Sequence, residues 1–425
     1  MDRSAGTGAT DLSGRRLLIV EEALRNYVGH WFEYVNSVAK INEGAGVQVT
    51  VAAHRQIDKQ LASPICAHGV FAQTNWDGIY NYPQAWRRYI GAAQHNWRVY
   101  RVMSRFLEET GPYDCVFVPT VVIHHIGAWR FLAAREIGHS IKRLVLFFRN
   151  NIAHYDVDSS EPRYARSRIV WRHLLQGFEP QIHDGSVCFA TDSERLAHEY
   201  EVLAGIRPAV FPSPRISSFQ YVPQRAPSAP FVFGCLGPAR FEKGIDVLQT
   251  AAKRFLALRP DADVRFVIQW NQPIRNEGGT IYSPDPEFVS DRRVRLITEP
   301  LDSAAYDSQV RATDCMVLPY RRASYFARIS GVAVEAVTAG IPVIYTENTW
   351  MADLVERVGA GVAVRDGNID SVVAAISRVF DEREVFRQRA CDAISAARAA
   401  HSSAGFATAL WTARSGLDAA GMQGP

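Results

Sequence analysis

Two basic residues, Arg240 and Lys243, lie in the segment 236-LGPARFEKGIDVL-248, which joins an apolar run to a helical pattern. A loop at the end of a strand would therefore carry both side chains. Two cations in such a loop can neutralise the charge that develops on a departing diphosphate. The alternative is that both are solvated, because basic side chains beside a helix start are usually exposed. The segment predicts either a diphosphate site or an ordinary polar surface.

A second candidate anion site lies where Ser330 and Gly331 begin an apolar helix that carries Glu335. The first turn of a helix offers unpaired N–H groups and the positive end of the helix dipole, so a pyrophosphate can bind there. Glu335, about one turn further on, can accept hydrogen bonds from ribose hydroxyls. The alternative is a serine N-cap on a core helix, with Glu335 solvated. The run 340-GIPVI-344 favours the ligand site, because it returns the chain to a strand beneath a strand-end loop.

In the first half of the chain, Gly29 and His30 follow one apolar strand, and His124 and His125 follow another. Ligands of open α/β sheets bind at the carboxyl ends of strands, so these residues are candidates for lining a cleft. His30 fits core packing and substrate contact equally well. Adjacent histidines point in different directions and no cysteine or carboxylate spacing accompanies them, so we predict no metal site.

The elements that must position these residues form two series. Strands are expected at 15–23, 47–54, 114–120, 143–150 and 185–193, with helices between them, which indicates a parallel βαβ arrangement. The proline-rich stretch 208–230 interrupts the pattern, and a second series follows it. We therefore predict an α/β fold of two Rossmann-like, doubly wound domains facing each other across a cleft, at 15–215 and 230–400. Residues 401–425 would form a C-terminal helix and tail that pack back on the first domain.

Composition bounds the class of protein. The 425 residues are 47% hydrophobic and 21% charged with a net charge of +3, which suits a two-domain globular protein and gives no sign of nucleic-acid binding. The six cysteines are scattered, and we interpret them as free thiols in a reducing compartment. The first fourteen residues lack an apolar signal segment, and no later run is long enough to cross a bilayer. These features favour a cytoplasmic protein.

The stretch 86–109 combines aromatic and basic residues on one expected helix, with Trp86, Trp97 and Arg101 among them. Such a helix suits the surface of an anionic membrane or a lipid-linked acceptor. The alternative packs the aromatic rings inward and leaves the arginines in solvent. Peripheral contact with the inner face of a membrane is therefore a secondary hypothesis.

The second half resembles the donor-binding domain of the retaining glycosyltransferase family four, also called glycosyl transferases group 1, whose members have the GT-B architecture. Glu335 with Ala336, Gly340, Pro342 and Val343 matches the second of two family glutamates, which binds the nucleotide ribose. The family also has a glycine, an arginine and then Glu-Lys-Gly at the start of this domain, which 242-EKG-244 matches. The resemblance covers 231–380 and is weak before 208.

Two positions depart from the family pattern. The first family glutamate falls on Ala327, and the usual arginine falls on Pro238, two residues before Arg240. Recognition of the donor sugar would then come from Arg328 or Tyr325. The family also places a glycine loop near Gly29 and a sugar-contacting histidine near His124 and His125.

The resemblance implies an enzyme that transfers a sugar, with retention, from a nucleotide-diphosphate sugar to a hydroxyl acceptor, which can be a glycan, a lipid-linked molecule or a small molecule. Lys243 and Arg240 would stabilise the leaving diphosphate, Ser330 and Gly331 would hold it, and Glu335 would fix the ribose. No Asp-x-Asp signature with a Mg-binding context, no Walker loop and no Gly-x-Gly-x-x-Gly fingerprint follows the first strand, so we expect no metal or other cofactor. A nucleotide-sugar epimerase and an inactive GT-B-like binding subunit remain the competing interpretations.

Overall fold

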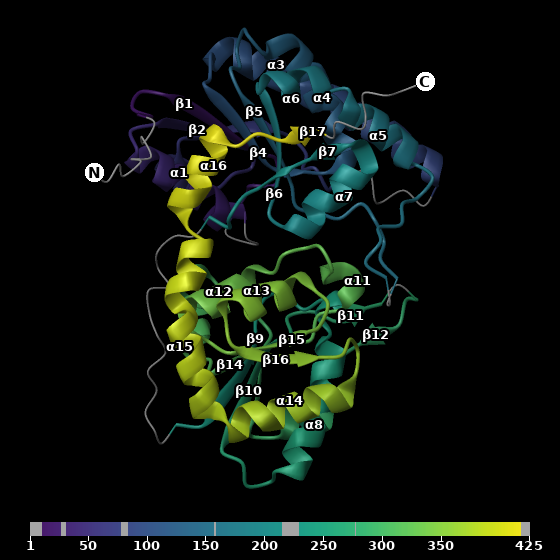
Figure 1. The fold of residues 1–425 in the computed structure, drawn as a ribbon, viewed down its shortest axis with the longest axis vertical. Coiled ribbons are helices and arrows are strands. Elements are labelled where there is room, and N and C mark those ends of the chain that lie inside the picture. Colours follow the sequence, from purple (N-terminus) through teal and green to yellow (C-terminus); the bar gives the residue numbers. More distant parts are fainter. Residues whose placement is uncertain are drawn as a thin grey trace, which may run out of the picture.

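The computed structural model describes residues 11–26, 31–77, 84–156, 159–214, 229–276 and 278–417. Two parallel β-sheets, of seven and six strands, lie one beyond the other along the long axis of the molecule, and helices flank each sheet (Figure 1). The predicted α/β fold of two Rossmann-like domains is confirmed.

The N-terminal sheet has the strand order β3-β2-β1-β4-β5-β6-β8. Its strands are β1 (Arg16–Glu21), β2 (Gln48–His54), β3 (Ala67–Phe71), β4 (Cys115–Val121), β5 (Leu144–Phe148), β6 (Val187–Thr191) and β8 (Ala209–Val210). The order reverses between β1 and β4, and their carboxyl ends meet at that switch point. Helices α1 (Trp31–Gly44), α2 (Lys59–Ala62), α3 (Ala85–Thr110), α4 (Ile126–Glu136), α5 (Arg168–Gln176), α6 (Glu179–Asp184) and α7 (Glu194–Ala204) belong to this domain.

The C-terminal sheet has the order β13-β10-β9-β14-β15-β16, with its switch point between β9 and β14. Its strands are β9 (Phe231–Cys235), β10 (Val264–Gln269), β13 (Val294–Ile297), β14 (Cys315–Leu318), β15 (Val343–Thr346) and β16 (Gly361–Val364). Its helices are α8 (Ile245–Leu258), α9 (Pro286–Ser290), α10 (Ser303–Arg311), α11 (Arg322–Tyr325), α12 (Gly331–Ala339), α13 (Trp350–Val358), α14 (Ile369–Asp381) and α15 (Arg383–Ala400).

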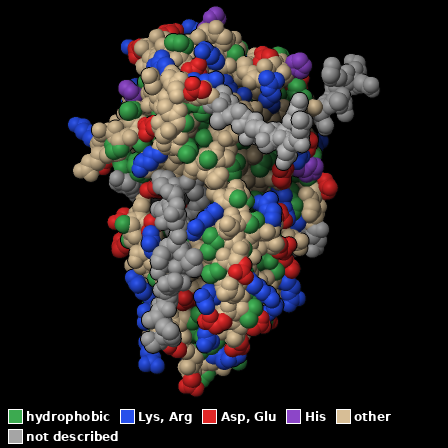
Figure 2. All heavy atoms as spheres, turned by 60° about the vertical axis from the view of Figure 1, so that its left-hand side comes forward, with side chains coloured by type: hydrophobic (Ala, Val, Ile, Leu, Met, Phe, Trp, Pro, Cys, Tyr) green, Lys and Arg blue, Asp and Glu red, His purple; other side chains and the backbone are tan. Residues whose placement is uncertain are grey.

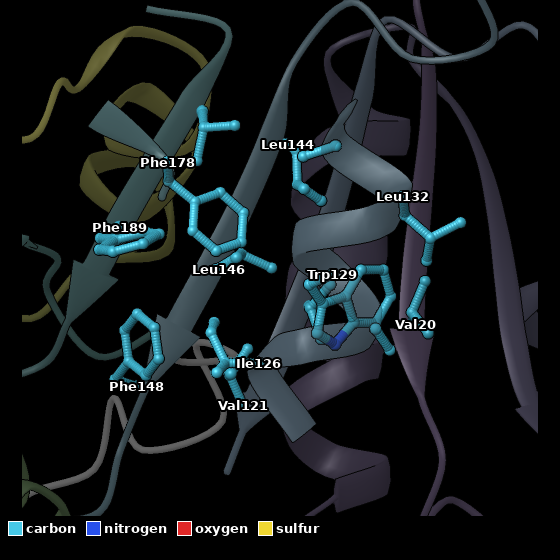
Figure 3. Close-up of a cluster of buried hydrophobic side chains, with 14 of the residues drawn as sticks. Val20, Val121, Ile126, Trp129, Leu132, Leu144, Leu146, Phe148, Phe178 and Phe189 are labelled. Carbon is cyan, nitrogen blue, oxygen red and sulfur yellow. The ribbon is translucent and has the colours of Figure 1, made fainter. Parts of the chain in front are cut away.

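The strands form where apolar runs rich in β-branched and aromatic residues are buried on both faces, as in β5 and β6, all of whose residues are buried. Trp129 of α4 points toward the strands that carry Val20 and Leu144, and it is almost fully buried (Figure 3). All six cysteines are free thiols, and four of them lie buried in strands. Lysines, arginines and acidic residues are interspersed on the face drawn in Figure 2, in keeping with the small net charge.

The chain returns to the first domain at its end. Helix α15 runs beside the second domain, and α16 (Ser403–Thr412) packs on α1 (Figure 1). Phe406 and Leu410 of α16 are fully buried in the N-terminal core, and Trp411 Nε1 donates a 2.7 Å hydrogen bond to Asn42 Oδ1. The two domains are therefore joined both before β9 and through α15.

Helix α3 projects its first turns into solvent. Trp86 is 59% exposed and Trp97 61% exposed, and Tyr89 and Ile90 between them are also exposed. The alternative in which the aromatic side chains of this helix pack inward is wrong for Trp86, Tyr89 and Trp97, because the helix joins the hydrophobic core further along, at residues such as Met103 and Leu107. None of the described helices is both long and apolar enough to cross a membrane.

Candidate active site

Lys243 lies in the loop after β9, at the switch point of the C-terminal sheet. It ends a 3-10 turn over Phe241–Lys243, and its side chain is only 6% exposed. Burial lowers the pKa of its ammonium to about 8. Because the side chain is buried, the alternative of a solvated lysine does not hold. Lys243 Nζ lies 5.8 Å from the ring centroid of Tyr320, and the described part of the chain gives it no hydrogen bond and no ion pair.

Two glycines allow close packing in the loop that carries Lys243. Gly237 has φ +90°, and a Cβ built there would lie 2.6 Å from Lys243 Nζ. Gly244 has φ +62°, and a Cβ there would lie 2.0 Å from the carbonyl oxygen of Pro319, directly after β14. The backbone N–H of Gly237 donates to Gln269 Oε1 at 2.7 Å. The loop is thus fixed against both β10 and β14.

Two more cations lie near Lys243. The charges of Arg240 and Arg328 help to lower the pKa of Lys243, whereas Glu242 opposes them. Arg240 is partly exposed and lies 3.7 Å from Glu242 Oε1, and the Arg328 guanidinium lies 5.4 Å from the ring centroid of Tyr325. A buried cation that keeps its charge near neutral pH beside two like charges needs an anion.

Helix α12 begins at the predicted residue. Ser330 is its N-cap, and Ser330 Oγ accepts a 3.3 Å hydrogen bond from the Ala333 N–H. Gly331 is exposed, and a Cβ built there would meet open space. Glu335 is half-buried, and its Oε2 accepts a 2.5 Å hydrogen bond from the Tyr306 hydroxyl. Glu335 is therefore held in place by α10.

The segment that departs from the family pattern joins the two domains. Phe326 and Ala327 pack into the core of the N-terminal domain, and the Ala327 carbonyl accepts a 2.5 Å hydrogen bond from Ser193 Oγ. Ala327 is 2% exposed, so a glutamate there would bury a carboxylate against that core. Arg195 reinforces the contact through hydrogen bonds of 2.7 Å to both carboxylate oxygens of Asp353 on α13.

Tyr325 is buried, and its ring centroid lies 4.5 Å from that of Tyr320. Burial raises the pKa of Asp192, which follows β6 in the other domain, and the charges of Arg149 and Arg328 oppose that shift. Arg328 therefore acts across the interface. The structure brings Arg240, Lys243, Tyr325 and Arg328 together around the end of β14.

A group of polar residues lies at the carboxyl ends of strands in the N-terminal sheet, and the sequence analysis did not single it out. Glu21, Arg149 and Asp192 follow or end β1, β5 and β6. Burial raises the pKa of Glu21 to about 7 and that of Asp192 to about 6, although Arg149, 3.6 Å from Asp192, opposes the second shift. The available signal was a polar residue directly after each apolar strand run.

His124 and His125 are buried between α3 and α4. The His125 ring stacks on that of His95 from α3, with centroids 3.7 Å apart and planes within 6°. Desolvation lowers the pKa of His124 to about 4, and it is also the largest of the effects that lower the pKa of His125. Gly29 and His30 lie outside the described residues.

Glu22, His95 and His125 place one potential ligand atom each within 4.8 Å of one another. An imidazole lone pair lies in the plane of its ring. A single ion cannot lie in both planes of a face-to-face pair, so these histidines would have to turn before they could share a metal. The arrangement is a stacked histidine pair beside a carboxylate.

Residues 230–382, most of the C-terminal domain, match the family model described as Glycosyl transferases group 1. A search of curated protein sequences found no match.

Solved structures share the architecture over nearly the whole chain. Sucrose-phosphate synthase from Thermosynechococcus elongatus is 12% identical with a TM-score of 0.61, and the alignment covers 92% of this chain and 96% of that one. HepE from Anabaena, in complex with UDP and glucose, is 14% identical with a TM-score of 0.60, covering 93% and 97%. The catalytic domain of starch synthase IV from Arabidopsis thaliana, bound to ADP and acarbose, is 13% identical with a TM-score of 0.54, covering 90% and 95%.

These likenesses establish the GT-B fold, and the family match covers the domain that contains Lys243 and Glu335. The chain therefore carries a domain of the group 1 glycosyltransferase type at residues 230–382.

Proposed function

We propose that the protein transfers a sugar from a nucleoside-diphosphate sugar to a hydroxyl acceptor, with retention at the anomeric carbon. The observation that carries the proposal is Lys243, a buried lysine with no acidic partner among the described residues, accommodated by a glycine at the switch point of the C-terminal sheet. The complexes of HepE with UDP and of starch synthase IV with ADP support a nucleotide in the corresponding fold. Retention is supported by the resemblance of the 242–244 and 335–343 segments to a retaining family.

Lys243 would bind the diphosphate and stabilise the charge that appears on it as the glycosidic bond breaks. Arg240 and Arg328 would add charge from either side of the loop. The N-terminus of α12 at Ser330 and Gly331 would supply backbone N–H groups. Glu335, oriented by Tyr306, would accept hydrogen bonds from the ribose.

Sugar recognition would rest on Arg328 and Tyr325. Ala327 cannot supply the carboxylate that the family usually has, and its backbone is already used to join the domains. Arg328, whose charge reaches Asp192 in the other domain, would contact the donor sugar from the interface between the domains. Closure of the domains over the donor would exclude water and limit hydrolysis.

A thermal-shift screen with UDP, ADP and GDP sugars tests the donor assignment, because a ligand that binds only the folded state raises Tm. One nucleotide should raise the Tm of the wild type, and it should raise the Tm of Glu335→Ala less, because that variant is expected to bind the donor more weakly. No shift with any nucleotide sugar would contradict the proposal. Conversion of the donor without an acceptor would instead identify an epimerase, and donor binding without hydrolysis or transfer would identify an inactive binding subunit.

Peripheral contact with an anionic membrane is a second proposal, favoured by the exposed aromatic residues at the start of α3. Trp86, Tyr89 and Trp97 are accompanied by exposed Arg87 and Arg101. The wild type should sediment together with phosphatidylglycerol vesicles, whereas the double variant Trp86→Ser, Trp97→Ser should stay in the supernatant. Equal sedimentation of both proteins would remove this proposal and leave the transferase assignment intact.

A further inference from the structure

A small pocket of about 160 Å³ lies at the carboxyl edge of β1, β2 and β3, covered by α3. Its floor is apolar and includes Phe71 and Val99. Its polar lining comes from the ends of β1, β2 and β3 and from α3. It includes Glu22, Arg55, His95 and Arg98. The same edge of the sheet carries Asp192 and Ser193, which face the second domain.

The two arginines of the pocket have no acidic partner in the described part of the chain. Arg55 Nε donates to the Val70 carbonyl at 3.2 Å, which fixes the side chain and leaves its remaining N–H groups for a ligand. Arg98 is half-buried, and its charge reaches the stacked histidines, where it helps to lower the pKa of His125. Two guanidinium groups beside one pocket form a site for an oxyanion, because each can donate two parallel hydrogen bonds.

The buried polar atoms beside these arginines also lack partners. His95 is 1% exposed, and neither ring nitrogen has a hydrogen-bond partner among the described residues. Its Nε2 lies 3.0 Å from Glu22 Oε2, yet the pair does not have hydrogen-bond geometry. A buried polar atom without a hydrogen bond destabilises the folded protein, so a pocket lined by such atoms favours a polar ligand.

A cation is the less favourable occupant. Among the described residues that line the pocket, Glu22 is the only acidic one, and the two arginines outweigh it. The face-to-face stack of His95 and His125 also prevents both rings from binding one ion in their present orientation.

We propose that this pocket binds the phosphate or carboxylate group of an anionic acceptor. Arg55 and Arg98 hold the anion, and His95 with Glu22 contacts its polar substituents. The volume suits a single charged group rather than a whole sugar ring. The identification as an acceptor subsite rests on the proposed transferase function, whereas the binding of an anion does not.

Calorimetry with the full chain tests the proposal with three probes of similar size: glycerol 3-phosphate, glycerate and glycerol. The variants are Arg98→Gln and Arg55→Gln, of which the second changes an exposed residue. Circular dichroism checks that both variants fold. Arg105→Gln on the same helix is the matched control, because Arg105 points away and pairs with Glu109 at 2.8 Å. Lys243→Ala reports any binding of the probes at the donor site.

We expect an anionic probe to bind at least tenfold more tightly than glycerol, and each pocket variant to weaken it at least tenfold. Arg105→Gln and Lys243→Ala should leave that affinity unchanged. A preference for glycerol 3-phosphate identifies a phosphate subsite, and a preference for glycerate identifies a carboxylate subsite. Equal binding of glycerol, no binding of either anion, or a loss confined to Lys243→Ala would overturn the proposal. Nucleotide binding is measured separately, so a failure of the donor assignment is distinguishable.

Discussion

The loop around Lys243 and the pocket around His95 both place buried polar groups that make no hydrogen bond to the described residues at the carboxyl edge of a parallel sheet. They differ in how the chain builds them. Lys243, Gly237 and Gly244 lie within eight residues, and one turn brings them together. Glu22, Arg55, His95 and His125 come from four elements that only the fold assembles. A site whose residues lie in one loop can be recognised as a sequence motif, whereas a site whose residues come from distant elements cannot.

Replacing Lys243 should have the largest effect. Lys243→Ala should lower kcat by about a hundredfold or more and change donor affinity far less, because the charge it stabilises appears in the transition state. Steady-state kinetics with a calorimetric donor affinity separates the two. A folded variant that turns over within a few-fold of the wild type would remove the catalytic role and weaken the contrast between the two regions.

Gly237→Ala should lower turnover by roughly tenfold, because its Cβ would displace Lys243 Nζ. The matched control is Gly138→Ala, whose glycine has φ +84° but open space where its Cβ would lie. Both variants should lose about 1 kcal/mol of stability from backbone strain. Equal activity of the two would show that Gly237 is required only for its conformation.

Glu335→Ala should weaken donor binding by about 1–3 kcal/mol without unfolding the protein, since it removes charged hydrogen bonds to the ribose. Tyr306→Phe should weaken donor binding less, because it removes only the group that orients Glu335. Calorimetry with the donor nucleotide measures both. An unchanged affinity in Glu335→Ala would refute the ribose assignment.

A chelator should have the smallest effect. Transfer activity is expected to persist in EDTA, because the diphosphate is assigned to cationic side chains and backbone N–H groups. A complete loss that a divalent ion restores would show that a metal takes part, and the cluster of Glu22, His95 and His125 would then be the first place to look.

Much of the second domain could be predicted from the sequence. Its apolar runs are bounded by glycine and proline, and α12 begins at Gly331 and ends at Ala339, as expected. Strand β3 was missed, because 67-AHGVF-71 contains a histidine and a glycine and lies at the sheet edge with two exposed residues. The exposed aromatic side chains of α3 could not be foreseen, since periodicity does not say which helix face meets the core.

The candidate site was readable only in part. The motif placed Lys243 and Glu335, but the burial of Lys243 depends on Gly237 and on the end of β14, which pairs with β9 only in the folded sheet. Ala327 looked like a lost contact in the sequence. The structure gives it a positive role, because its small side chain lets the segment pack into the other domain.

The most direct test is the proton uptake that accompanies nucleotide binding. Burial holds the pKa of Lys243 near 8, so the free protein at pH 8 carries the proton on about half of its molecules. A bound diphosphate favours the charged form and raises that pKa, so binding should take up protons, and affinity should fall as the pH rises above 8.

Calorimetry at pH 8 in buffers of different ionisation enthalpy measures this uptake with UDP or ADP, whichever binds. The account predicts an uptake of roughly half a proton per nucleotide in the wild type and none in Lys243→Met. Equal uptake in both proteins, or none in the wild type despite tight binding, would contradict the assignment of Lys243 to the diphosphate.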